Sequence, residues 1–115
     1  MFGWRAAFAN SMAGLRHAWR HERAARQEMI ALGAGLVVAP LLARSGLHFV
    51  LLLTAVAFVL VIELLNAGLE AICDRVTKEH DPYVKVAKDC GSAAVMVAVG
   101  MGCLIWAEAL WSRLA

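Results

Sequence analysis

Four polar residues interrupt an apolar stretch in the second half of the chain, where the sequence reads VIELLNAGLEAICDRV. They are Glu63, Asn66, Glu70 and Asp74, at intervals of three, four and four residues. At about 100° per residue, these intervals place all four within about 80° of arc on one face of a helix. Carboxylates inside a membrane span are costly and mark candidate functional sites. The alternative interpretation is a polar contact between helices or a water-lined groove.

The depth of these carboxylates in a membrane indicates which reaction they could support. The apolar stretch from Leu47 to Ile62 extends about 24 Å as a helix, so in a hydrocarbon core of about 30 Å Glu63 lies near the inner edge. Glu70 lies about 10 Å further toward the cytosol. Such a groove suits a reaction between a lipid and a water-soluble anion. Because carboxylates repel phosphate, we expect a divalent cation such as Mg²⁺ between them. Glu63, at membrane depth, suits a general base.

Charged residues at the ends of the apolar stretches have both chemical and plain interpretations. Lys88 and Asp89, which follow Lys85, open the third apolar stretch at the level of Glu70. A Lys there can act as a point charge on a phosphate, or it can simply mark the cytoplasmic boundary. Glu22, four residues before Arg26, fits either an ordinary surface ion pair or a metal ligand, and the spacing leaves both open.

The composition excludes most other classes of protein. Of the 115 residues 62% are hydrophobic and 17% are charged, whereas soluble domains average about 45–50% and about 25%. A chain this short cannot bury that much apolar surface, so we expect a membrane protein. Three Cys exclude a disulfide scaffold. The sequence has no P-loop, no kinase Gly-rich loop and no zinc spacing of His and Cys. We expect no nucleic-acid partner.

The charge-poor stretches predict an all-α membrane protein with three transmembrane helices after an N-terminal surface helix. Nine of the eleven Lys and Arg residues fall on one side of the membrane in a three-span arrangement, and Arg44 and Arg113 fall on the other. The positive-inside rule therefore predicts a cytoplasmic N-terminus and an external C-terminus. The expected segments are a surface helix over 1–25, spans over 26–44, 47–73 and 87–111, and a cytoplasmic loop over 74–86.

Two further patterns concern the membrane surface and the contacts between helices. Trp4, Phe8, Leu15 and Trp19 recur at helical spacing, which predicts an amphipathic helix on the cytoplasmic leaflet rather than a signal peptide. Its role could be anchoring alone. Three spans enclose a site poorly, so we expect oligomerisation with sites shared between subunits. A small-residue stripe on the third span predicts a close-packing face: Ala87, Gly91, Ala94, Ala98 and Gly102.

The stretches GLRHAWRHERAARQE, VIELLNAGLEAICDRV and AKDCGSAAV resemble the prokaryotic integral-membrane diacylglycerol kinases. The resemblance runs from about Leu15 to the end of the chain, with matching order and spacing of the spans. It implies a homotrimer in the bacterial inner membrane that phosphorylates diacylglycerol from ATP with Mg²⁺ at the cytoplasmic face. A sister group of the family acts on undecaprenol, but the R-x-E-x-A-x-R-Q-E pattern is closer to the diacylglycerol branch.

The resemblance also implies roles for individual residues. By position, Glu63 matches the catalytic base, and Glu22 and Glu70 match the metal-binding carboxylates. The residues that match nucleotide contacts, or the loop near the nucleotide, are Asn10, Glu22, Glu70, Glu79, His80, Asp81, Lys88 and Asp89. The residues placed at the lipid substrate are Arg16, Trp19, Arg26, Glu28, Glu63, Asn66 and Ser92.

The sequence departs from the family pattern at three positions. Gly3, with Arg5 close by, stands where the family often carries a basic residue that touches phosphate and substrate. Asn10 stands where the family places an aromatic side chain near the nucleotide. Glu108, inside the third span, has no counterpart and is expected to reach water. Two alternatives to a diacylglycerol kinase follow from the sequence: an undecaprenol kinase, or a non-enzymatic membrane scaffold or ion conduit.

Overall fold

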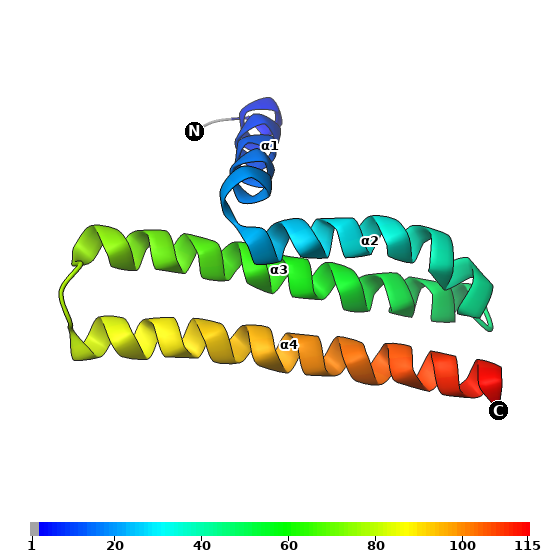
Figure 1. The fold of residues 1–115 in the computed structure, drawn as a ribbon. Helices are drawn as coiled ribbons and strands as arrows, with labels where there is room; N and C mark the ends of the chain where they lie inside the picture. The colour runs from blue at the N-terminus through cyan, green and yellow to red at the C-terminus, as the bar shows by residue number, and fades with distance from the viewer. Residues whose placement is uncertain (1–2) are drawn as a thin grey trace.

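The computed structural model describes residues 3–115 and shows an all-α chain, which confirms the predicted fold class (Figure 1). Three of its helices are long and apolar enough to cross a membrane, and a shorter helix precedes them, as the sequence predicts. Residues 1 and 2 of the predicted surface helix lie outside the described part. Within residues 3–115 the helices are α1 (Trp4–His21), α2 (Arg23–Leu42), α3 (Gly46–Val76) and α4 (Pro82–Leu114).

The three long helices lie side by side and antiparallel to their neighbours in sequence, while α1 projects away from them (Figure 1). With 20 residues, α2 is about 30 Å long, whereas the 31 residues of α3 extend about 46 Å. As a result α2 begins alongside the middle of α3, and the α3–α4 pair continues without it for about 16 Å. The half of α3 that carries the polar residues is therefore the half that α2 covers least.

Polar caps set the ends of α3 and α4. Ser45 Oγ accepts a hydrogen bond from His48 N at 3.0 Å, which caps α3 directly after the tight turn from α2. Asp81 Oδ1 accepts bonds from Tyr83 N at 2.9 Å and Val84 N at 3.1 Å, and Pro82 occupies the first helical position. Helices fill most of the expected loop over 74–86, because this cap starts α4 early and only residues 77–81 connect the two.

The contact between helices uses small side chains at the end of the bundle near the α2–α3 turn. Ala39, Leu52 and Ala109 form a buried cluster contributed by α2, α3 and α4. Trp106 Nε1 donates a hydrogen bond to Leu52 O at 3.1 Å, so α4 is bonded to the backbone of α3. On the predicted small-residue stripe of α4, Ala98 is buried and a Cβ at Gly102 would lie 3.7 Å from Ala55 O. Such close approach is typical of helix contacts in membranes.

Large apolar side chains on α2, α3 and α4 point outward instead of filling a core. Val37 is 70% exposed, Leu47 80% and Leu104 75%. Water-exposed apolar surface of this extent does not occur on stable soluble monomers, so lipid or other protein must cover it. The apolar stripe of α1 is also exposed, at Trp4, Phe8 and Trp19.

Candidate functional site

Three carboxylates lie in the surroundings of Glu63, and together with it we call them the acidic cluster: Glu22, Glu28, Glu63 and Glu70. Glu28 of α2, Glu70 of α3 and Glu22 at the start of α2 all lie near enough to Glu63 for their charges to be felt there. All four side chains are partly buried. Among residues 3–115 none of the four takes part in an ion pair. The cluster therefore carries negative charge that the described residues do not neutralise.

Glu22 owes its position to a break in the helix. Its backbone is extended, with φ −116° and ψ 102°. Glu22 is therefore both the C-cap residue of α1 and the N-cap residue of α2. Arg26 Nη1 donates a hydrogen bond to Trp19 O at 2.9 Å, which ties α2 to the last turn of α1 across this break. The ordinary Glu22–Arg26 surface pair that the spacing allowed is not formed within the described residues. Glu22 instead lies near enough to Glu63 of α3 for its charge to be felt there.

Polar contacts within α3, and between α3 and α4, extend the site toward the connection of these helices. Asn66 Nδ2 donates to Glu70 Oε1 at 3.3 Å. One turn further along α3, Asp74 Oδ1 accepts a hydrogen bond from Lys88 Nζ at 2.8 Å. The charge of Glu70 also acts on Lys88. At Asn66 and Asp74 the predicted stripe of α3 lies against α4, and Lys88 pairs with it there.

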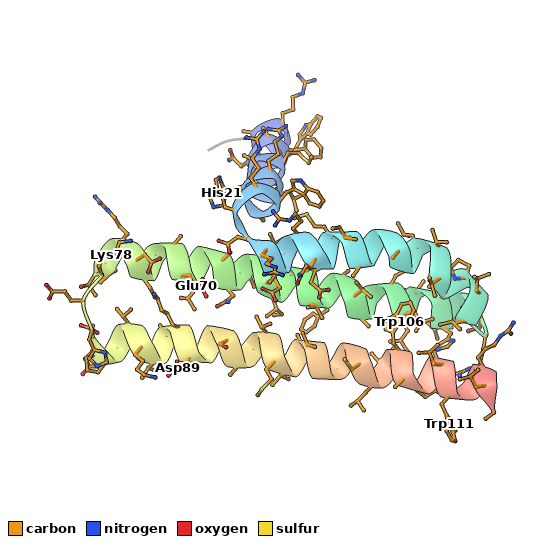
Figure 2. All side chains as sticks on the ribbon, viewed as in Figure 1. His21, Glu70, Lys78, Asp89, Trp106 and Trp111 are labelled. Atoms are coloured by element: carbon orange, nitrogen blue, oxygen red, sulfur yellow. The ribbon has the colours of Figure 1, made fainter. Side chains whose placement is uncertain are left out.

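The other residues expected at the nucleotide lie mainly at the same end of the bundle. Figure 2 shows Glu70 on α3 and Asp89 on α4 in the half near the α3–α4 connection, which carries Lys78. Glu79 and His80 are exposed in that connection, where Asp81 caps α4. Asp89 is paired with Lys85 at 2.7 Å. Asn10 lies exposed on α1.

The residues expected at the lipid are distributed over three helices. Arg16 and Trp19 are exposed on α1, and Ser92 is exposed on α4. Glu28 belongs to the acidic cluster and also lines one end of an apolar groove of about 360 Å³ between α2, α3 and α4. Within this single chain the structure brings Glu28, Glu63 and Asn66 to one region and leaves Arg16, Trp19 and Ser92 facing outward.

An ion pair at the opposite end of the bundle was missed by sequence reasoning. Arg44 Nη1 and Nη2 donate to the two carboxylate oxygens of Glu108 at 3.1 and 2.9 Å, and His48 Nε2 lies 4.0 Å from Glu108 Oε1. The hydrogen bond to Glu108 raises the pKa of the Arg44 guanidinium above its ordinary value, so Arg44 stays charged. The sequence did contain a signal for this pair, because Arg44 and Glu108 each interrupt an apolar stretch near the predicted outer side of the membrane.

The acidic cluster is compatible with a metal that arrives together with phosphate. In the part of the chain that the structure describes, no three His, Cys, Asp or Glu side chains converge closely enough to hold a metal alone. Mg²⁺, however, is usually bound through one or two carboxylates plus substrate phosphates and waters. The donor chemistry of Glu22 and Glu70, two carboxylates without a cationic partner in residues 3–115, fits such a site.

The fold and site define a multi-pass helical membrane protein with a carboxylate site at one level of the bundle. The family described as Prokaryotic diacylglycerol kinase matches residues 9–110. The diacylglycerol kinase of Escherichia coli strain K12 is 40% identical over 103 residues, which cover 90% of this chain and 84% of that protein. Those of Pseudomonas aeruginosa PAO1 and Helicobacter pylori 26695 are 40% and 36% identical over 100 residues, each covering 87% of this chain and respectively 81% and 78% of the relative. The chain therefore belongs to the prokaryotic diacylglycerol kinase family and is a lipid kinase.

Proposed function

We propose that the protein transfers the γ-phosphate of ATP to diacylglycerol, giving phosphatidic acid and ADP at the cytoplasmic surface of the membrane. The observation that carries this proposal is the position of Glu63, within reach of the charges of Glu22, Glu28 and Glu70. The choice of diacylglycerol as the lipid substrate rests on the relatives compared above, all of which are diacylglycerol kinases.

In the proposed reaction Glu63 is the general base. Its carboxylate accepts the proton of the primary hydroxyl of diacylglycerol while that oxygen attacks the γ-phosphorus in line, and the bond to the β-phosphate oxygen breaks to release ADP. Most of the work in phosphoryl transfer is positioning and charge neutralisation.

Glu22 and Glu70 are the proposed metal ligands, one from the helix break and one from α3. Mg²⁺ bound there together with the nucleotide would neutralise charge on the phosphates that the carboxylates otherwise repel. Lys88 is proposed to bind a phosphate oxygen, exchanging its partner Asp74 for the nucleotide. Asp89, Glu79, His80 and Asp81 would lie on the nucleotide side, as would Asn10 of α1.

The lipid is proposed to approach from the apolar side of the same level. Glu28, Asn66 and Glu63 would face its headgroup, with Arg26 close by at the start of α2. Arg16, Trp19 and Ser92 point outward in the single chain, so in this proposal they meet lipid or a neighbouring subunit. A homotrimer with sites between subunits would also cover part of the exposed apolar surface. The orientation proposed from the Lys and Arg distribution places this level in the cytoplasmic leaflet.

The test measures transfer of radiolabelled phosphate from ATP into an organic-extractable lipid, in mixed micelles, with and without Mg²⁺. Wild-type protein should label diacylglycerol only with the cation present, and Glu63→Gln should reduce turnover at least about a hundredfold, as expected for loss of a general base. Glu108→Gln, the same change at the far end of the bundle, should retain turnover. Near-normal activity of Glu63→Gln removes the base role from this residue.

The same assay separates the possible acceptors. Equal or greater labelling of undecaprenol than of diacylglycerol would overturn the lipid assignment while keeping the kinase chemistry. No Mg²⁺-dependent consumption of ATP with either lipid would overturn the kinase function itself.

A further inference from the structure

Helix α4 approaches α3 closely at Gly91, beside the site. A Cβ on Gly91 would collide with Asn66 Oδ1, and would lie 3.1 Å from Leu69 Cδ2 and 3.2 Å from Asn66 Cγ. The backbone does not require glycine here, since no glycine in the described chain has a positive φ. Glycine is therefore needed at this position because a side chain would not fit beside Asn66. Gly100, further along α4, has nothing within 4 Å of the place that a Cβ would occupy, and it offers a contrast on the same helix.

The Asn66 side chain fills the space that Gly91 leaves open. Its Nδ2 donates to Glu70 Oε1 at 3.3 Å, while its Oδ1 is buried and has no hydrogen-bond partner among the described residues. The opposite amide orientation would place Oδ1 against the Glu70 carboxylate, so the bond to Glu70 fixes which end of the amide faces α4. When the NH₂ group of Asn66 bonds to Glu70, the carbonyl oxygen faces α4 and is left without a hydrogen bond among the described residues.

We propose that Gly91 is a positioning residue for the reaction: by lacking a side chain it lets the Asn66 amide stand between α3 and α4 and hold Glu70. The inference rests on the proposed function, in which Glu70 is a metal ligand. The Asn66 bond occupies one lone pair of Glu70 Oε1 and leaves Oε2 available to a cation. Groups that orient a metal ligand in this way typically change metal affinity or activity by about 10- to 100-fold when they are lost.

The first test compares Gly91→Ala with Gly100→Ala, which adds the same methyl group to α4 away from Asn66. In Gly91→Ala the Mg²⁺ concentration at half-maximal velocity should rise by about 10-fold or more, while in Gly100→Ala it should stay at the wild-type value. Binding of Mn²⁺ in the presence of ATP and without lipid, followed by electron paramagnetic resonance, should weaken in parallel. Unchanged cation binding in a folded Gly91→Ala protein would overturn the proposal.

The second test asks whether Gly91 acts through Asn66. Asn66→Ala alone should weaken Mn²⁺ binding, and adding Gly91→Ala to it should cause no further loss, because the obstructed amide is already absent. A further loss of similar size in that background would contradict the proposal. If Gly91→Ala does not fold, the double variant still tests it, since removing the amide relieves the collision and should restore the thermal unfolding transition in micelles.

These readouts separate the positioning role from the kinase function. If the wild-type protein labels no lipid but Gly91→Ala still binds Mn²⁺ more weakly than the wild type, the role of Gly91 is kept and the kinase proposal is rejected. Normal wild-type turnover with identical Mn²⁺ binding in wild type and Gly91→Ala would reject the role of Gly91 alone.

Discussion

Lys88 Nζ of α4 lies 2.8 Å from Asp74 Oδ1 of α3, so the lysine proposed to bind nucleotide phosphate is held by a carboxylate of the neighbouring helix. The two side chains are 42% and 49% exposed, and ion pairs this exposed contribute little to stability. A phosphate oxygen can therefore replace Asp74 at small cost. The pair holds the Lys88 ammonium group at α3.

The two members of this pair should differ in their effect on nucleotide binding. Lys88→Met should raise the KM for ATP by about 10-fold or more, because a charge-assisted hydrogen bond to phosphate is lost. Asp74→Asn should leave that KM within about fivefold of wild type, as expected for loss of an exposed ion pair. Steady-state kinetics at saturating lipid measures both. An equally large rise in Asp74→Asn would show that Asp74 itself contacts the nucleotide or its metal.

Asp81 has a structural task that can be separated from its expected place near the nucleotide. Asp81→Ala removes the acceptor for Tyr83 N and Val84 N and should destabilise the protein by about 1 kcal/mol. Asp81→Asn should retain the cap, since Asn is as good an N-cap residue as Asp. Thermal unfolding in micelles compares the stabilities. If Asp81→Asn raises the KM for ATP without changing stability, the carboxylate acts on the nucleotide as well.

Arg44 and Glu108 should contribute to the stability of the bundle and not to its chemistry. Their hydrogen bonds join the α2–α3 turn to α4 at the end away from the acidic cluster. Arg44→Met should lower the Tm slightly and leave turnover per folded molecule unchanged, because both side chains are about half exposed. The exchange Arg44→Glu with Glu108→Arg should recover part of the loss. A fall in kcat in Arg44→Met would connect this end to the reaction.

The sequence predicted the part of the site that lies on one helix. The stripe of Glu63, Asn66, Glu70 and Asp74 follows from helical periodicity alone. At Asn66 and Asp74 it lies against α4. Glu22 could not be assigned in this way, because its place depends on the break between α1 and α2, where the backbone becomes extended. The sequence has no Gly or Pro around Glu22 that would predict a helix break there.

The sequence predicted which face of α4 packs against other helices, but it did not predict which residues meet there. The small-residue stripe identified the packing face of α4, whereas the specific fit of Gly91 to Asn66 depends on the register between α3 and α4. That register is set by the length of the connection over 77–81, which the Asp81 cap shortens. The Arg44–Glu108 pair was missed for the same reason, since single-helix periodicity says nothing about residues 64 positions apart.

Arg26 should control the position of Glu22 through the joint between α1 and α2. Its hydrogen bond to Trp19 O spans this break. Arg26→Gln should raise the Mg²⁺ concentration at half-maximal velocity by about 10-fold, since a proposed metal ligand loses its support. Amide hydrogen exchange in the last turn of α1 should become faster, with little change in the exchange of α3.

Arg20→Gln is the matched control, because Arg20 is exposed in the same last turn of α1. It should change neither the Mg²⁺ dependence nor the exchange rates, although it removes the same charge. A rise in the KM for diacylglycerol in Arg26→Gln, without any change in Mg²⁺ dependence, would show instead that Arg26 acts on the lipid, as the family resemblance implies. Because the two outcomes affect different substrates, one kinetic experiment on each decides whether Arg26 holds the helix joint or the headgroup.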